Sequence, residues 1–392
     1  MKGEPKSPDV RILASVIARQ PSIVRAAARR ETRTAAPWLV IFLALAVAGC
    51  EPFQRTEAPA GVVRGESRWS AANWSELPGW SSDLPLQAWP AFLRSCERAS
   101  SEWSATCTRA RQAAPRNDAE AREWFVRNLR PYRVESLQGE TRGLITGYYE
   151  PTLEARRQPS ATFRYPLHAA PADLALRQPY WTRQELESDP AAQAALRGRE
   201  IAYVADPLEA LGLHVQGSGR LRITEADGVV RWARLAYAGN NGRQYQSVGR
   251  WLIDRGELPP GQASWPAIRD WAQRNPQRLQ ELLWANPRYV FFREEPMTDA
   301  GLGPRGAQGV ALTPGRSIAV DPRGMPYGTP VWIDATEPLS NAPLQRLVVA
   351  QDTGSAIVGA VRADYFWGWD ARAAEQAGRM KQPLRLWVLW PR

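Results

Sequence analysis

Residues 318–324 read Ile-Ala-Val-Asp-Pro-Arg-Gly, and two later segments resemble them, Val-Val-Ala-Gln-Asp-Thr-Gly at 348–354 and Arg-Ala-Asp-Tyr-Phe at 362–366. In each, the aspartate is expected at the end of a strand or on the turn that follows it. Such placement brings carboxylates together at one rim of a sheet while the strands stay packed. A lone aspartate there is usually a turn residue that accepts backbone N–H bonds. The set of three therefore predicts a functional site within a β fold.

Short strands are predicted on both sides of these segments. Runs of β-branched and aromatic residues bounded by Gly, Pro and Asn predict strands at 144–149, 200–204, 213–216, 230–235, 289–292, 317–320, 330–333, 347–350 and 384–389. Helices are predicted around Trp89 and Phe92, after the capping-box pair Asn117 and Glu120, and over 264–285. Because no βαβ repeat is visible, closed barrels rather than a doubly wound sheet are the expected architecture.

The length and charge of the chain limit its class. A chain of 392 residues is long enough for two domains with substantial cores. Its formal charge is +10, but residues 1–49 carry eight basic and three acidic side chains, which account for half of the excess. The remainder has no basic block and no Lys/Arg stripe. Nucleic acid is therefore not predicted as a partner, whereas a mildly basic enzyme acting on an anionic wall polymer fits this balance.

The N-terminal segment has the features of a bacterial lipoprotein signal peptide. Four arginines precede an apolar run over 38–48, which is too short to span a bilayer comfortably and leads into Val-Ala-Gly-Cys at 47–50. This tetrapeptide resembles a lipobox, in which the cysteine, here Cys50, is acylated and becomes the new N-terminus. Glu51 in place of aspartate favours the outer membrane by resemblance to known sorting rules. We expect a signal peptide at 1–49, a tether at 50–75 and an outer-membrane lipoprotein facing the periplasm. A plain signal-anchor helix is the alternative.

The other cysteines and the histidines give no metal-binding pattern. Cys96 and Cys107 are candidates for one disulfide that staples a short helical hairpin in an oxidising compartment. Together with His168 and His214 they match no ligand spacing, so neither a metal nor a cofactor is predicted. His214 lies in the alternating run 211–215, where a strand histidine is more often structural than catalytic.

Five further motifs accompany the aspartate segments. They are Thr-Gly-Tyr-Tyr-Glu-Pro at 146–151, Leu-His-Val-Gln-Gly-Ser-Gly at 213–219, Tyr-Ala-Gly-Asn-Asn-Gly at 237–242, Ser-Val-Gly-Arg at 247–250 and Asn-Pro-Arg-Tyr-Val-Phe-Phe at 286–292. Over roughly residues 85–392 the pattern resembles the membrane-bound lytic murein transglycosylase A family, whose C-terminal part is called the three-aspartate domain. The resemblance implies a mainly β fold with peripheral helices, namely a double-psi β-barrel domain plus a second, smaller inserted β-barrel domain, with a glycan-binding groove between them.

The resemblance also implies domain boundaries and site residues. The first barrel would take residues 76–153 and 295–392, and the inserted barrel would take 154–294. The third aspartate, Asp364, would be catalytic, with Asp352 close by. The implied substrate-binding residues are Thr146, Tyr148, Tyr149, Gln216, Gly217, Ser218 and Asp321.

The reaction that the resemblance implies needs only one carboxyl group. Protonated Asp364 would donate to the glycosidic oxygen between N-acetylmuramic acid and N-acetylglucosamine, and its carboxylate would then deprotonate the muramoyl C6 hydroxyl, which closes a 1,6-anhydro ring. Because the substrate supplies the nucleophile, proximity comes from the sugar itself. The pKa of Asp364 must then be raised, by burial or by Asp352. Arg362 is either a surface cation or a group that lowers this pKa.

Less specific interpretations stay open for several motifs. Tyrosines in strands are core residues about as often as sugar-binding ones. Residues 216–219 and 240–242 are also typical of tight turns, Trp232 is more simply a core residue, and the family pattern does not demand an acid at Glu150.

Two other functions compete with the transglycosylase hypothesis. One is a hydrolase of the same fold that positions a water with Asp352 and Asp364. The other is a non-catalytic peptidoglycan-binding lipoprotein, which the complete aspartate set disfavours. The expected partners are peptidoglycan glycan strands and the outer membrane, through the lipid anchor, and cell-wall synthases or amidases are candidate protein partners.

Overall fold

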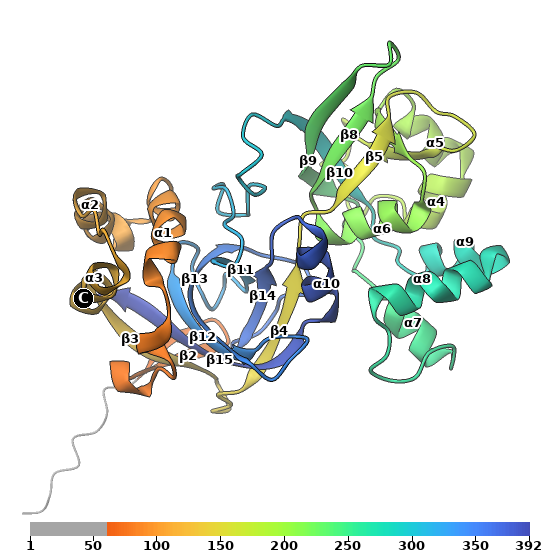
Figure 1. The fold of residues 1–392 in the computed structure, drawn as a ribbon. Coiled ribbons are helices and arrows are strands. Elements are labelled where there is room, and N and C mark those ends of the chain that lie inside the picture. The colour runs from red at the N-terminus through yellow and green to blue at the C-terminus, as the bar shows by residue number, and fades with distance from the viewer. Residues whose placement is uncertain (1–60) are drawn as a thin grey trace, which may run out of the picture. The chain divides into compact units, whose positions relative to one another are not determined.

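A nine-stranded sheet carries all three aspartate segments in the computed structural model, which describes residues 61–392 (Figure 1). Its strands are β1 (Val62–Arg64), β2 (Ser67–Ala71), β3 (Leu129–Ser136), β4 (Gly143–Tyr148), β11 (Ser317–Val320), β12 (Pro330–Thr336), β13 (Pro343–Asp352), β14 (Arg362–Phe366) and β15 (Lys381–Pro391). They follow in the order β1-β2-β3-β15-β12-β13-β11-β14-β4, and β15 also pairs with β4. This last pairing closes the strands from β15 to β4 into a barrel. The pairs β11–β13 and β14–β4 are parallel, whereas the other pairs of this sheet are antiparallel.

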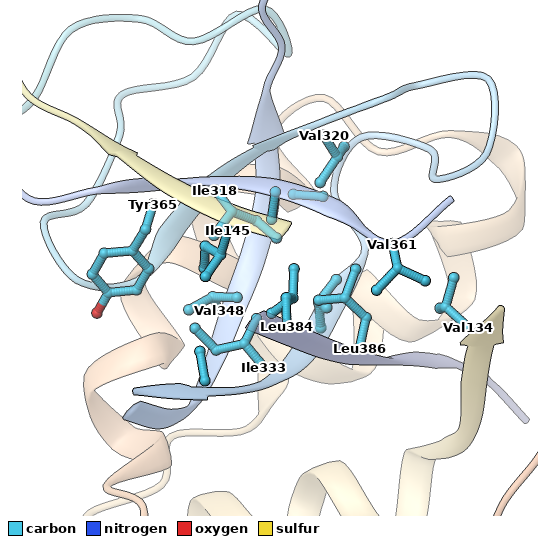
Figure 2. Close-up of a cluster of buried hydrophobic side chains, with 14 of the residues drawn as sticks. Val134, Ile145, Ile318, Val320, Ile333, Val348, Val361, Tyr365, Leu384 and Leu386 are labelled. Atoms are coloured by element: carbon cyan, nitrogen blue, oxygen red, sulfur yellow. The ribbon is translucent and has the colours of Figure 1, made fainter. Parts of the chain in front are cut away.

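Apolar side chains from alternate strand positions fill this barrel. Figure 2 shows Ile145, Ile318, Val348 and Tyr365 converging from four strands, and each is fully buried. Burying a large aliphatic or aromatic side chain contributes about 1.5–3 kcal/mol. Because successive residues of a strand point to opposite faces, the residues between these positions face out of the barrel.

The second sheet has six strands, which come between β4 and β11 in the sequence. They are β5 (Thr152–Arg156), β6 (Tyr165–His168), β7 (Glu200–Val204), β8 (Gly219–Thr224), β9 (Val230–Asn240) and β10 (Val290–Pro296). The order is β10-β9-β8-β5-β7-β6, and a bridge between Ala169 and Phe292 links its two edges. Leu153, Leu221 and Leu235 pack in its core. The predicted fold class, a larger barrel with a smaller inserted one, is confirmed.

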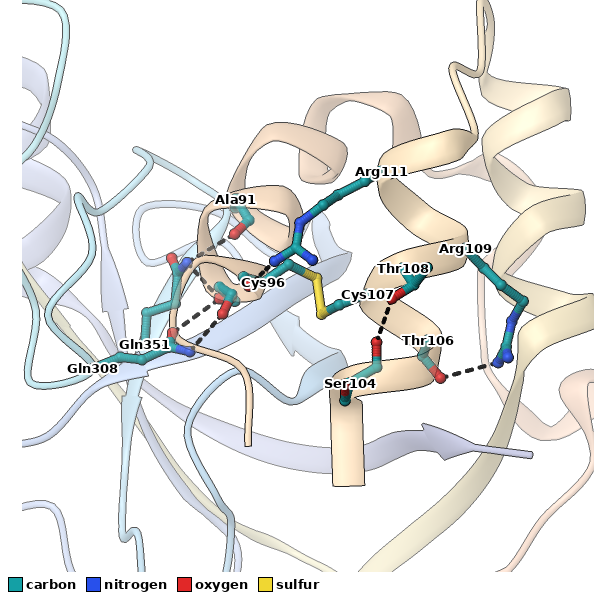
Figure 3. Close-up of a disulfide and its surroundings, with 11 residues drawn as sticks. Ala91, Cys96, Ser104, Thr106, Cys107, Thr108, Arg109, Arg111, Gln308 and Gln351 are labelled. Atoms are coloured by element: carbon teal, nitrogen blue, oxygen red, sulfur yellow. Dashed lines mark hydrogen bonds between the residues drawn. A yellow bond between two sulfur atoms is a disulfide. The ribbon is translucent and has the colours of Figure 1, made fainter. Parts of the chain in front are cut away.

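Helices cover both barrels. The first barrel carries α1 (Trp89–Cys96), α2 (Ser104–Gln112), α3 (Asp118–Asn128) and α10 (Ala371–Arg379), and the inserted part carries α4 (Arg183–Ser188), α5 (Pro190–Leu196), α6 (Pro207–Gln216), α7 (Val248–Asp254), α8 (Trp265–Arg274) and α9 (Leu279–Trp284). A disulfide between Cys96 and Cys107 joins α1 to α2 (Figure 3). None of the helices in residues 61–392 is long and apolar enough to cross a membrane.

The buried side chain of Gln351 ties β13 to helix α1 (Figure 3). Its Nε2 donates to the carbonyl of Ala91 and to Ser95 Oγ, each at 2.8 Å, and its Oε1 accepts from Ser317 Oγ at 2.5 Å. An unpaired buried amide costs about 1–3 kcal/mol, so these partners fix the strand. The backbone at Asp352, the next residue, is thereby held in place.

Three predictions about elements are wrong. Within the tether predicted at 50–75, residues 62–71 instead form β1 and β2, which pair with the first sheet, and Trp69 is buried in it. Residues 213–216 belong to helix α6, which begins at Pro207 with Asp206 as its N-cap. The helix predicted at 264–285 is broken at Pro276, because proline cannot continue the hydrogen-bond ladder. The signal peptide and Cys50 lie outside the described residues.

Candidate active site

Four neighbouring strands place one residue each in a row across the outside of the first barrel. A register shift just after Ile318 interrupts the alternation of β13 and pairs Asp352 with Ala319 of β11. Ala319 pairs with Asp364 of β14, and Asp364 pairs with Thr146 of β4. Paired strands lie about 4.8 Å apart, so the Cα atoms of the two aspartates are separated by roughly 10 Å. The small side chain of Ala319 leaves space between them. Two aspartates therefore share one face of the sheet.

Asp364 faces outward from the middle of its strand. The prediction that all three aspartates lie at a strand end or turn is wrong for Asp364, because it is the middle residue of β14. Its neighbours Ala363 and Tyr365 point into the barrel, so Asp364 faces out. Its side chain is half-buried. Thr146 Oγ1 donates a hydrogen bond to Asp364 Oδ1 at 2.5 Å, and Arg362 Nη2 donates to Thr146 Oγ1 at 2.8 Å.

Burial makes Asp364 a weaker acid than an exposed aspartate. It raises the pKa of Asp364 to about 6, even though the hydrogen bond from Thr146 and the charge of Arg362 both lower that pKa. The charge of Asp352 raises the pKa further, but less than burial does. The carboxyl group is therefore protonated in about half of the molecules at pH 6 and in about a tenth of them at pH 7.

Asp352 is held on both oxygens. Tyr148 Oη donates to Oδ2 at 3.0 Å, and the backbone N–H of Ala307 donates to Oδ1 at 2.9 Å. Burial raises the pKa of Asp352, and these hydrogen bonds oppose the rise. Burial also raises the pKa of Tyr148 well above its ordinary value, with the charges of Asp352 and Asp364 acting in the same direction, so its hydroxyl stays a donor.

Asp321 supports a loop and is not joined to the other two aspartates by any bond within residues 61–392. Arg323 donates to its oxygens at 3.0 and 2.7 Å, and the Gly359 N–H donates at 3.0 Å. The hydrogen bond from Arg323 is the main cause that lowers the pKa of Asp321 to about 2. It therefore stays ionised and has no proton to donate near neutral pH.

Two residues of this site, Ala307 and Tyr327, were not predicted from the sequence. Ala307 contributes only a backbone N–H, which any residue except proline could supply. Tyr327 lies close enough for the charges of Asp352 and Asp321 to raise its pKa, together with burial, which is the larger cause. Its place follows from folding of the 321–330 turn.

The residues predicted around Gln216 lie at the junction of the two barrels. Gln216 Oε1 accepts from the Tyr149 N–H at 3.1 Å, and Gly217 ends helix α6 in the left-handed conformation (φ 80°). The predicted tight turn between strands is therefore a helix end, and Ser218 links it to β8. Tyr149 and Trp265 line two cavities there, of about 300 and 220 Å³, between α10 on one side and α6 and α8 on the other.

Glu150 is a buried ion-pair residue and not a second catalytic acid. Arg220 Nε donates to Oε2 at 2.7 Å and Arg234 Nε donates to Oε1 at 2.6 Å, with no exposed surface on the glutamate. Trp232, for which core packing was the simpler interpretation, is 48% exposed.

Both histidines are buried in the inserted part. His168 Nδ1 lies 2.8 Å from Tyr289 Oη, and His214 Nδ1 lies 2.8 Å from Arg183 Nη2. Burial lowers the pKa of His168 to about 4 and the pKa of His214 well below its ordinary value, so both rings are neutral. In residues 61–392, no group of three His, Cys, Asp or Glu side chains is arranged to hold a metal ion.

Known proteins share this fold and sequence pattern. Residues 144–293 match the MltA specific insert domain, and residues 316–390 match the 3D domain. The membrane-bound lytic murein transglycosylase A of Vibrio cholerae is 32% identical over 285 residues, which cover 68% of this chain and 73% of the relative.

Solved structures of lytic transglycosylases are also similar to this chain. The lytic transglycosylase LtgG of Burkholderia pseudomallei is 44% identical with a TM-score of 0.57, covering 85% of this chain and 99% of that one. Escherichia coli MltA with bound chitohexaose is 25% identical with a TM-score of 0.65, covering 86% of this chain and 97% of that one. By matched domains, identity and coverage, this chain belongs to the membrane-bound lytic murein transglycosylase A family.

Proposed function

We propose that this chain is a lytic transglycosylase that cleaves the β-1,4 bond between N-acetylmuramic acid and N-acetylglucosamine of peptidoglycan without water. The observation that carries the proposal is the outward-facing carboxyl group of Asp364, whose pKa burial raises to about 6. A general acid works best when its pKa lies near the working pH. The names of its relatives support the substrate class.

The proposed reaction uses one proton in two steps. Asp364 donates its proton to the glycosidic oxygen as the bond from that oxygen to the muramoyl C1 breaks. The muramoyl C6 oxygen then bonds to C1, and its proton passes to the Asp364 carboxylate. The products are an N-acetylglucosamine end and a 1,6-anhydromuramoyl end, and the acid is restored. The nucleophile is already attached to the reacting sugar, which removes the entropic cost of bringing a second molecule.

Asp352 has a supporting role in this proposal. Its negative charge favours the protonated form of Asp364. Its oxygens accept hydrogen bonds from Tyr148 and Ala307, which hold the carboxylate in place beside Asp364.

We further propose that the glycan strand is bound at the junction of the two barrels. Tyr149, Trp265 and Trp369 line the larger junction cavity, and aromatic faces suit sugar rings. The E. coli relative was solved with chitohexaose, an oligosaccharide of N-acetylglucosamine units. Acylation of Cys50 would anchor this enzyme at the outer membrane, facing the periplasm, and the names of the relatives describe them as membrane-bound.

Mass spectrometry of the products tests the reaction directly. Purified sacculi digested with the wild-type protein should release anhydromuropeptides, which are lighter by one water than hydrolysis products. Products of the hydrolytic mass would contradict the proposal in favour of the hydrolase. Binding to sacculi without any loss of turbidity would favour a non-catalytic binding protein.

The pH dependence of the rate should show the acid role of Asp364. We expect kcat/KM on soluble glycan fragments to fall tenfold per pH unit above about pH 6, because the protonated fraction of a group with a pKa of about 6 falls in that proportion. This falling part of the curve is the alkaline limb of the pH–rate profile. Asp352→Asn should move the alkaline limb to lower pH, since the charge of Asp352 raises the pKa of Asp364. A rate that stays constant up to about pH 8 would contradict the assignment.

A further inference from the structure

We propose that Arg362 and Thr146 form a directional hydrogen-bond chain that places the acidic proton of Asp364 on Oδ2, the oxygen left free for the substrate. This inference rests on the proposed function and deepens it. Both residues act through Asp364 and are therefore positioning residues.

The direction of the chain follows from which groups can donate. A guanidinium only donates hydrogen bonds, so Thr146 Oγ1 must accept from Arg362 Nη2 at 2.8 Å. The Thr146 hydroxyl proton then points to Asp364 Oδ1 at 2.5 Å, and this hydroxyl has no other acceptor within residues 61–392. In the reversed arrangement Thr146 Oγ1 would accept from both groups, and its own proton would have no acceptor among residues 61–392.

This direction decides which oxygen of Asp364 is protonated. Oδ1 already accepts the Thr146 proton, so the proton of the neutral acid is favoured on Oδ2. No side chain or backbone group of the described part of the chain bonds to Oδ2. The proton is thus aimed away from the sheet, where a glycosidic oxygen could receive it.

The strand register explains why these residues meet. Arg362 and Asp364 are two positions apart on β14 and share its outer face. Parallel pairing places Thr146 of β4 beside Asp364. Arg362 Nη1 also donates to the carbonyl of Ala363, which anchors the guanidinium. The other groups facing Asp364 are Ala319 from β11, the carboxylate of Asp352 from β13 and the neutral phenol of Tyr148 from β4.

Thr146→Val separates positioning from simple adjustment of acidity. The Thr146 hydrogen bond lowers the pKa of Asp364, so the variant should move the alkaline limb of the pH–rate profile to higher pH. If Thr146 only adjusted acidity, the variant would be faster than the wild type above pH 6. We expect the opposite, a kcat lower by about tenfold to a hundredfold at every pH, because the proton is no longer directed.

Matched variants complete the test. Thr146→Ser keeps the hydroxyl, so its kcat and the pH of its alkaline limb should both match those of the wild type. Arg362→Met should move the limb upward and lower kcat by less than Thr146→Val, while Arg142→Met, which removes an exposed charge near the start of β4, should change neither. Unfolding curves for each variant exclude loss of fold.

Two results would overturn the inference. One is a Thr146→Val enzyme as fast as or faster than the wild type above pH 6, and the other is a Thr146→Ser enzyme as slow as the valine variant. Failure of the proposed function itself would look different, because the wild type would then release no anhydro products.

Discussion

Asp364→Asn should lower the rate of anhydromuropeptide release from purified sacculi by about 10²-fold to 10⁴-fold, the usual range for loss of a general acid. The amide keeps the shape of the carboxyl group, and its oxygen can still accept from Thr146 Oγ1. Its NH₂ group, however, cannot deliver a proton to the leaving oxygen or take one from the C6 hydroxyl. Quantifying products by mass spectrometry at several enzyme concentrations would measure the residual rate.

The same variant should be more stable than the wild type above pH 6. The pKa of Asp364 is raised from 3.8 to about 6 in the folded protein, so folding binds a proton between these values and stability falls as the pH rises through them. Above pH 6 the ionised carboxylate therefore costs at most about 3 kcal/mol, which the amide avoids. Below about pH 4 this cost disappears.

The reaction rate and the stability of Asp364→Asn must be measured together, because each result decides how the other is interpreted. A slow variant that is also less stable at pH 7 would indicate damage to the fold rather than loss of an acid. Near-normal turnover would remove Asp364 from the mechanism. A matched change at Asp321, whose pKa is lowered to about 2, should not stabilise the protein at any pH, because that carboxylate is favoured in its ionised form.

Local sequence patterns predicted most strands but not how they pair. The run 317–320 is β11 with the predicted bounds, because β-branched residues next to a Gly and Pro turn carry a local signal. Helix α6 was misread as a strand, since Leu211, Leu213 and Val215 recur with a period of two, whereas the helix buries Leu211 and His214, which lie three positions apart. Barrel closure through β15 and β4 depends on contacts between residues far apart in sequence.

The candidate site shows the same limit. Asp364 and Asp352 were identified through the family resemblance, but the partner of Asp364, Thr146, lies 218 positions away in sequence. Only the parallel pairing of β14 with β4 brings the two together. The sequence left the role of Arg362 open between a surface cation and a pKa-lowering group, and its hydrogen bond to Thr146 could not be predicted from either interpretation.

The buried ion cluster around Glu150 joins the two barrels where the chain crosses between them. Glu150 follows β4, which carries Thr146 and Tyr148, and its own N–H bonds to the Gly368 carbonyl just beyond β14 at 2.7 Å. Arg220 and Arg234 reach it from β8 and β9 of the inserted barrel. Both arginines also donate to the Leu302 carbonyl on the returning segment, at 3.0 and 2.7 Å. One carboxylate thus pairs with two cations, and these three side chains connect three segments of the chain.

Glu150→Gln should lower the free energy of unfolding by about 3–5 kcal/mol, because removing one partner of a buried ion pair leaves uncompensated charge, here on two guanidiniums. The matched control is Glu154→Gln, which breaks a pair of similar length, 2.9 Å to Arg222, whose side chains are 59% and 42% exposed. Exposed pairs contribute about 0–1 kcal/mol, so this variant should be nearly neutral.

Urea unfolding of the two variants side by side would measure the difference. Should the glutamine at 150 prevent folding altogether, the double variant Glu150→Gln with Arg234→Met would decide the case, because it removes one of the stranded cations and should recover part of the lost stability. Equal and small losses for Glu150→Gln and Glu154→Gln would show that the cluster does not hold the barrels together. A large loss of unfolding free energy for Glu150→Gln alone, together with a lower kcat of the folded protein, would show that this cluster also keeps Thr146 and Tyr148 of β4 in position.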